Sequence, residues 1–245
     1  MAHAATGHIV TSTDLPQGVK DKFGDLAVLT GTALHDLWSE GMTAAIDSWY
    51  VAAGGIPSFV STAADVGSLT IIGILTADGS EGIETFNLTG AAPIALPSGD
   101  SYTCIPRMYY EAPVTGHQPV GKITASIGGV TISVINIGEG QTLQAFDVIP
   151  AGCVGYLTEA DRVSGLGDEI VVDLYTSATP ATSWRLRHRW RGDASPSRRV
   201  WGLESDPKTG RELVAGTRIK QTVKRVAGGA SQRMSGWFKY VRYAV

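Results

Sequence analysis

The stretch SLTIIGILTADGSEGIETFNL, residues 68–88, decides the fold class of this chain. Its first part, Ser68–Leu75, is a short apolar run of the kind that forms a buried strand. Ala77–Ser80 follows as a turn, because its Asp-Gly pair favours turn conformations. Ile83–Leu88 can then return antiparallel to the first strand. The stretch therefore predicts a β-hairpin.

Strand patterns of the same kind continue to the end of the chain and are separated by turns. They are expected at residues 102–110, 122–127, 130–137, 142–148, 154–163, 169–176, 184–191, 211–226 and 234–245. Gly128 and Gly129 join two of these strands as a favoured hairpin loop. About a dozen short strands predict an all-β protein, an antiparallel β-sandwich of the jelly-roll or immunoglobulin-like kind.

The first 58 residues differ from the rest because they show little sustained periodicity. We expect residues 1–58 to form an extended N-terminal arm, whose aromatic anchors Trp38 and Trp49 must lie on this chain or on a neighbour. Residues 59–245 are expected to form the β-sandwich domain. A split near residue 150 stays open, although the short turn Ile149–Gly152 is a poor interdomain linker and favours a single domain.

The net charge of −3 conceals an uneven distribution along the chain. Residues 1–150 hold 4 Lys+Arg against 14 Asp+Glu, a net charge of −10. Residues 151–245 hold 16 Lys+Arg against 9 Asp+Glu, a net charge of +7. An acidic part and a basic part can attract each other between copies, so the distribution favours self-association. Alternatively, the fold interleaves the two halves and averages the charge.

The basic charge is most concentrated in WRLRHRWR, residues 184–191. Strand alternation would place Trp184, Leu186, His188 and Trp190 on one face. The other face would carry four guanidinium groups, those of Arg185, Arg187, Arg189 and Arg191. Such a row is repulsive unless an anionic surface lies against it.

Three interpretations of this row stay open. The arginines can pair with acidic residues of a neighbouring subunit, contact nucleic acid, or protect an edge strand from aggregation. The acidic overall charge and the lack of a nucleic-acid-binding motif weigh against nucleic acid. We therefore expect a protein interface that combines Arg185, Arg187, Arg189 and Arg191 with the aromatic residues Trp38, Trp49 and Trp190.

No catalytic, cofactor-binding or metal-binding residues are expected. The five histidines lack metal-ligand spacing, and His188 alternates with tryptophans, as an interior or interface histidine would. Nucleophile-elbow, phosphate-loop and dinucleotide-binding motifs are absent from the sequence. The chain is therefore not expected to be an enzyme, although a carboxylate pair assembled from distant positions stays open. Whether Cys104 and Cys153 pair also stays open. No apolar run reaches about 18 residues, so no transmembrane helix is expected.

The last predicted strand alternates between two kinds of side chain. Met234, Gly236, Phe238, Tyr240 and Arg242 would share one face. Trp237, Lys239, Val241 and Tyr243 would share the other. An aromatic terminal strand of this kind is typical of a core, so we expect it to be tied into a sheet.

Several short segments, in this order, resemble small structural proteins in the virions of tailed bacteriophages. They are GVKDKFG at 18–24, DLW at 36–38, the hairpin at 75–90, IGEGQTLQAF at 137–146 and IPAGCVGYLT at 149–158. The resemblance covers most of residues 18–165 and, more loosely, residues 183–191 and the last strand. Cys153 departs from the family pattern, as does the long segment 192–210.

The resemblance implies a β-rich particle component present in many copies and without catalytic residues. Its most specific implication is a capsid cement or decoration protein that stabilises the head by binding across capsid subunits. The expected partners are the major capsid protein and copies of this chain, as a homo-oligomer with a trimer among the options. The expected location is the virion, assembled in the host cytoplasm, with no membrane partner. The alternative is a tail- or fibre-associated module that binds host-surface glycan.

Overall fold

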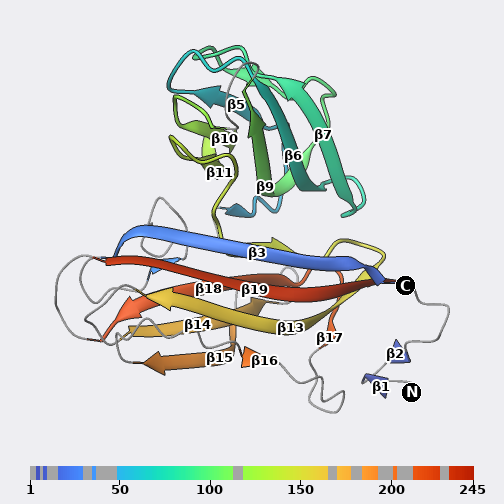
Figure 1. The fold of residues 1–245 in the computed structure, drawn as a ribbon. Coiled ribbons are helices and arrows are strands. Elements are labelled where there is room, and N and C mark those ends of the chain that lie inside the picture. The colour runs from blue at the N-terminus through green and yellow to red at the C-terminus, as the bar shows by residue number, and fades with distance from the viewer. Residues whose placement is uncertain are drawn as a thin grey trace. The chain divides into compact units, whose positions relative to one another are not determined.

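The fold is known from a computed structural model, which describes residues 4–5, 8–9, 16–29, 35–36, 49–112, 118–164, 170–177, 184–192, 201–202, 212–226 and 232–245. These residues form strands joined by turns, and all the strand pairs within them are antiparallel (Figure 1). The prediction of an all-β protein built from antiparallel sheets is confirmed. Within the described ranges, no helix has the length and apolar character needed to span a membrane.

The chain divides into two compact units, one inserted into the other. Residues 45–143 form what we call the inserted unit, and residues 1–44 together with 144–245 form the two-part unit. This division differs from the expected boundary at residue 58, because residues 16–29 form a strand in one sheet of the two-part unit and residues 35–36 form a strand in the other. The second boundary, at 143/144, lies near the split at 150 that the sequence left open. The turn Ile149–Gly152 is internal to the two-part unit.

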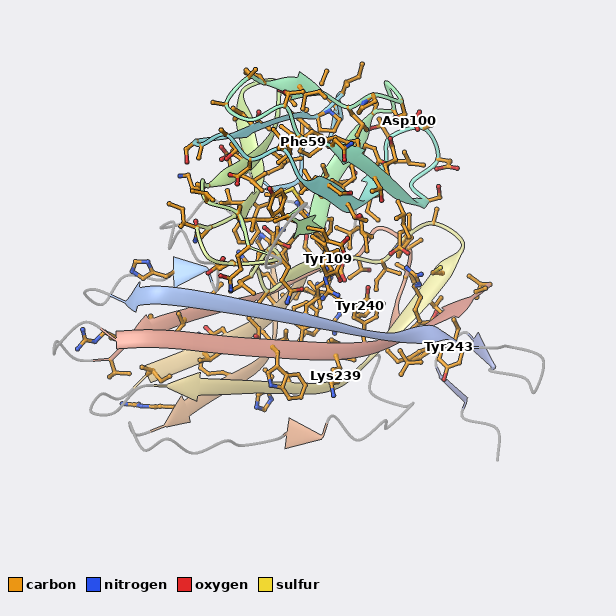
Figure 2. All side chains as sticks on the ribbon, turned by 45° about the horizontal axis from the view of Figure 1, so that its top comes forward. Phe59, Asp100, Tyr109, Lys239, Tyr240 and Tyr243 are labelled. Atoms are coloured by element: carbon orange, nitrogen blue, oxygen red, sulfur yellow. The ribbon has the colours of Figure 1, made fainter. Side chains whose placement is uncertain are left out.

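The inserted unit is a sandwich of two sheets. One sheet has the order β11 (Val130–Ile135), β10 (Ile123–Ile127), β5 (Ser58–Ser61), β8 (Ile94–Ala95). The other has the order β7 (Glu81–Asn87), β6 (Ser68–Leu75), β9 (Tyr102–Glu111). Apolar side chains from both sheets meet in one buried core, which includes Phe59, Leu69, Ile71, Tyr102 and Ile123 (Figure 2).

Both hairpins that the sequence predicted in this unit are present. β6 pairs with β7 from Ser68↔Asn87 to Ile74↔Glu81. β10 pairs with β11, and the loop glycines Gly128 and Gly129 have φ angles of 57° and 82°. These are left-handed conformations that glycine adopts without strain, which explains why the pair closes this loop.

The two-part unit is built from two larger sheets. One has the order β12 (Phe146–Val148), β18 (Arg218–Arg225), β14 (Ile170–Ser177), β15 (Arg185–Gly192), with β4 (His35–Asp36) also paired to β18. The other has the order β16 (Trp201–Gly202), β13 (Cys153–Ser164), β19 (Gln232–Ala244), β3 (Pro16–Leu29), with β17 (Glu212–Leu213) also paired to β13. A separate pair joins β1 (Ala4–Ala5) and β2 (His8–Ile9). The core of this unit includes Leu157, Val172, Leu174, Phe238 and Tyr240.

The last strand confirms its predicted alternation. Gly236, Phe238, Tyr240 and Arg242 are buried, whereas Trp237, Lys239, Val241 and Tyr243 are partly exposed. In Figure 2, Lys239 and Tyr240 extend to opposite sides of β19. β19 lies between β13 and β3, so the C-terminal strand is held on both sides by backbone hydrogen bonds.

The two cysteines lie in different units. Cys104 belongs to the inserted unit and Cys153 to the two-part unit, and both are buried thiols that form no disulfide with each other. The pairing that the sequence left open is therefore not formed, and neither core is closed by a disulfide between them.

The inserted unit is expected to fold on its own when residues 45–143 are expressed as a fragment. The physical reason is that its apolar core is formed entirely by residues of this range. The fragment should unfold in one cooperative urea transition monitored by circular dichroism. Its amide hydrogen exchange should match that of the same residues in the full chain. A fragment without a cooperative transition would contradict this expectation.

Candidate interaction surface on the basic edge strand

The arginine-rich segment forms β15, at one edge of its sheet. Among the described residues, β15 pairs with β14 alone, from Ile170↔Gly192 to Thr176↔Arg185. Ile170, Val172 and Leu174 on β14 point into the core of the two-part unit. Residues of β15 that pair with them share that face, and residues that pair with Val171 and Asp173 lie on the opposite face.

The four arginines do not share one face, and that prediction is wrong. The register shifts between Leu174, which pairs with His188, and Tyr175, which pairs with Leu186. Arg187 is the extra residue in this β-bulge, and a bulge reverses the alternation beyond it. Arg189 and Arg191 therefore lie on the face opposite the core, whereas Arg185 lies in register with Thr176 on the other face. The exposed side chain that the bulge brings to the outer face is Leu186.

All four arginines are nevertheless exposed. The structure describes 13 Lys and Arg side chains, and the exposed ones are Arg185, Arg187, Arg189 and Arg191. The other described cations are buried or partly buried. Exposed basic charge in the described part of the chain is therefore concentrated on this single strand.

Arg189 is neutralised by its own fold. Its Nε donates to Oδ1 of Asp173 and its Nη2 to Oδ2, both at 2.7 Å. The Asp173 side chain is 2% exposed, and the Tyr175 hydroxyl donates to its Oδ2 at 3.0 Å. Hydrogen bonding and attraction to Asp173 raise the pKa of Arg189 further above its ordinary value. The interpretation that neighbouring subunits neutralise the whole arginine row is therefore wrong for this residue.

Partial burial lowers the pKa of each of the two residues before Arg189. Arg187 donates from Nε to the hydroxyl of Thr176 at 2.6 Å, and burial followed by repulsion from Arg185 lowers its pKa. His188 lies opposite Leu174 on the core side, and burial lowers its pKa. A lowered pKa favours the neutral imidazole, in agreement with the expected interior histidine.

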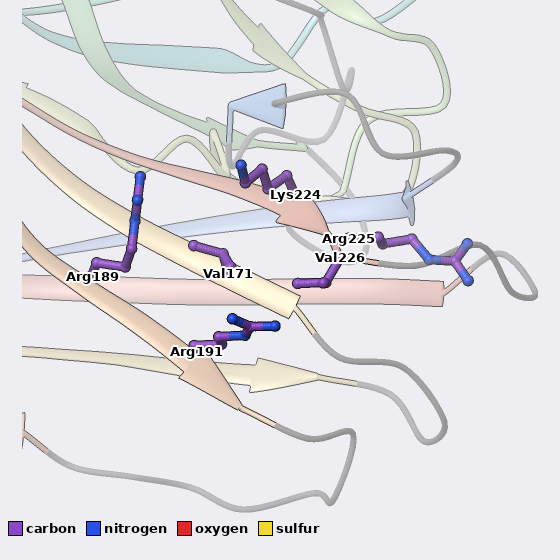
Figure 3. Close-up of a pocket in the computed structure, with 6 residues that line it drawn as sticks. All are labelled: Val171, Arg189, Arg191, Lys224, Arg225 and Val226. Atoms are coloured by element: carbon purple, nitrogen blue, oxygen red, sulfur yellow. The ribbon is translucent and has the colours of Figure 1, made fainter.

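A depression of about 350 Å³ lies on the outer face of this sheet. It is lined by Val171, Arg189, Arg191, Lys224, Arg225 and Val226 (Figure 3). Arg191 and Lys224 flank Val171 from the two neighbouring strands, and the guanidinium of Arg225 points away from the other labelled side chains. We call Arg189, Arg191 and Lys224 the basic face; among the described residues that line the depression, none is acidic.

Lys224 was missed by the sequence analysis. Its place beside the arginines depends on the register between β14 and β18, which are separated by about 50 residues. The signal that could have found it is the period of two in RIKQTVKR, residues 218–225. Buried Ile219 and Val223 alternate there with Lys220 and Lys224.

The three tryptophans expected at the interface have different outcomes. Trp49 is 1% exposed, so this chain already covers its ring and it is not an exposed anchor. Trp190 lies in β15 in register with Val172, and its side chain is outside the described part of the structure. Trp38 lies outside the described residues. In the described part of the chain, no cluster of three or more His, Cys, Asp or Glu residues is placed to hold a metal ion.

Comparisons with known proteins give little beyond this geometry. No known protein family and no curated protein matches the chain. A structure of the Gx strain of infectious bursal disease virus is similar at 11% identity and a TM-score of 0.27, over 94% of this chain and 73% of the viral chain. A structure of the Gt strain is similar at 9% identity and a TM-score of 0.26, over 98% and 73%. TM-scores this low support no inference about fold or function.

Proposed function

We propose that this chain is a structural protein of a bacteriophage virion, acting as a capsid cement or decoration protein with no catalytic role. Its partners are the major capsid protein and further copies of the chain. Its site of action is the virion, assembled in the host cytoplasm. The ordered resemblance to tailed-phage virion proteins motivates this proposal. Its segments fall in both sandwiches: the hairpin at 75–90 spans β7, and the segment at 149–158 leads into β13.

The observation that carries the proposal is the concentration of exposed cations on an edge strand. A strand at the edge of a sheet is a natural docking element, and exposed arginines direct which surface it meets. The exposed Leu186, at 45%, supplies apolar area between the charged groups. Many identical contacts of this kind can stabilise a shell without any one of them being tight.

The charge of the two units supports association between copies. The inserted unit holds 2 Lys+Arg against 8 Asp+Glu, a net charge of −6. The two-part unit holds the other 18 Lys+Arg against 15 Asp+Glu, a net charge of +3. The difference in net charge between the two units is smaller than that between residues 1–150 and 151–245, because the acidic residues of 1–44 belong to the basic unit. Its sign still favours attraction between unlike units.

Replacing Arg185 and Arg191 together with glutamate tests the proposal. Both side chains are exposed, so the double variant should keep its fold and its thermal midpoint, yet be lost from purified particles. Incorporation is measured by quantitative mass spectrometry of the particles. Arg189→Glu is unsuitable, because it would place a second carboxylate against buried Asp173. Lys122→Glu with Lys239→Glu is the matched control, with the same change in charge elsewhere. Normal incorporation of the Arg185/Arg191 variant would contradict the proposal and would leave the arginines only the role of protecting an edge strand from aggregation.

The alternative of a tail-associated module that binds glycan depends on exposed aromatic rings. The exposed large apolar side chains of the described residues are all aliphatic. The same mass spectrometry separates the two locations, because a shell component is present in hundreds of copies and a tail component in a few to some dozens.

A further inference from the structure

An acidic counterpart of the basic face lies on the inserted unit. The turn between β6 and β7 contains Asp78, and Glu81 is the first residue of β7. We call Asp78 and Glu81 the acidic turn. Residues 23–106 contain no lysine or arginine, so every formally charged side chain in this stretch at neutral pH is acidic.

The carboxylate at the tip of this turn is held in place and ionised. Oδ1 of Asp78 accepts hydrogen bonds from the backbone N–H of Ser80 at 2.9 Å and from its hydroxyl at 2.7 Å. These hydrogen bonds lower the pKa of the exposed Asp78 carboxyl. A preordered anion loses less conformational entropy on docking than a mobile one.

Each surface also offers exposed apolar area beside its charges. Ile83 follows Glu81 on β7 and is 61% exposed. Val226 lines the depression next to Lys224 and is 37% exposed. Apolar contacts surrounded by complementary charges are the usual composition of a specific protein interface.

We propose that the acidic turn of one copy docks on the basic face of a second copy. This inference rests on the proposed function, since it names the segment that the basic face binds during self-assembly. Arg191 and Lys224 receive the two carboxylates across the depression, and Ile83 packs beside Val226. The two surfaces are different, so the contact is heterologous, and it leaves one turn and one basic face open for further copies.

The first test is the oligomeric state of the full chain at two salt concentrations. Sedimentation velocity should show concentration-dependent association at an ionic strength of about 0.01 M and monomers at about 1 M, where charges are screened beyond about 3 Å. A chain that stays monomeric at low ionic strength overturns the inference.

The second test uses two neutralised variants of the full chain. Arg191→Gln with Lys224→Gln removes the two cations of the basic face that receive the carboxylates, and Asp78→Asn with Glu81→Gln removes the charges of the acidic turn. Each variant alone should have an association constant about tenfold or more below that of the unmodified chain. Mixed together they should form one-to-one dimers that do not grow, because only one pair of intact surfaces remains. Asp100→Asn with Glu111→Gln is the control for loss of acidic charge elsewhere on the inserted unit.

Two outcomes separate this inference from the proposed function. If the acidic-turn variant associates normally in solution and enters particles at the unmodified level, the docking inference fails and the virion role stands. If the unmodified protein is absent from particles while the two variants still complement each other, the virion role fails and the docking stands. Binding of duplex DNA to the basic face, with no self-association, assigns the face to nucleic acid and overturns the inference.

Discussion

Replacement of Asp65 by alanine is expected to lower the free energy of unfolding of the inserted unit by about 3–5 kcal/mol. Asp65 is 4% exposed and lies between β5 and β6. Its carboxylate accepts hydrogen bonds from the hydroxyl of Ser61 at 2.6 Å and from the backbone N–H groups of Val120 and Gly121, both at 2.8 Å. Alanine would leave these donors without their acceptor, and the segment before β10 would lose its tie to β5.

The effect should be confined to one unit and should depend on pH. Burial opposes ionisation of Asp65, but hydrogen bonds from Ser61, Val120, Gly121 and Tyr110 outweigh it and lower its pKa below 3.8. A lowered pKa in the folded state gives stability that is present above the unfolded pKa of about 3.9 and is lost as the pH falls through the folded value. The stability difference from the unmodified chain should therefore shrink below about pH 4.

Both effects are measured by urea titration at several pH values, with hydrogen exchange monitored separately in each unit. Asp65→Asn is the matched control, because it keeps the shape and one acceptor oxygen but cannot ionise. It should cost less stability than alanine, and its difference from the unmodified chain should also shrink below about pH 4, because neither variant carries the ionisable carboxyl. Equal loss of protection in the two-part unit would contradict the independence of the units.

Replacement of Phe238 by alanine is expected to destabilise the two-part unit by about 3–5 kcal/mol. Phe238 is fully buried on β19, between Ala160 of β13 and Lys22 of β3. Removing its ring leaves a cavity between two sheets whose backbones are held by hydrogen bonds and can close around it only in part.

The neighbouring residue gives a matched control for this cavity. Trp237 is larger than Phe238 but points to the opposite side of β19, where its ring is partly exposed and lies 4.9 Å from the ammonium of Lys239. Trp237→Ala should therefore cost about 1 kcal/mol or less, although it removes more atoms. Urea unfolding of both variants decides the point. A greater loss for Trp237→Ala would mean that the alternation of β19 has been assigned to the wrong faces.

The features that could be predicted from sequence are local ones. The strand expected at residues 169–176 is present as β14 (Ile170–Ser177), and its Ile170, Val172 and Leu174 are buried in the core. The glycine pair at 128–129 predicted its hairpin loop, because the conformation required there depends on those two residues alone.

The features that could not be predicted depend on partners distant in sequence. The bulge at Arg187 follows from the register with β14, and a strand pattern read by itself gives a strict period of two. The bond between Arg189 and Asp173 depends on the same register. The sequence therefore locates the exposed basic charge on this strand, but the faces of its side chains, the internal ion pair and the contribution of Lys224 required the sheet.

The pairing of β3 with β19 has a consequence for synthesis of the chain. About 200 residues separate the two strands, and ribosomes add roughly 5–20 residues per second, so β3 waits about 10–40 s for its neighbour. The inserted unit is complete well before that time. Lys20, Asp21, Lys22 and Asp25 interrupt the apolar residues of β3, and charges in such positions discourage a waiting strand from pairing with another nascent chain. Among residues 1–245, closure of the sheet that joins β3 to β19 is thus the last folding event, because it requires the synthesis of β19.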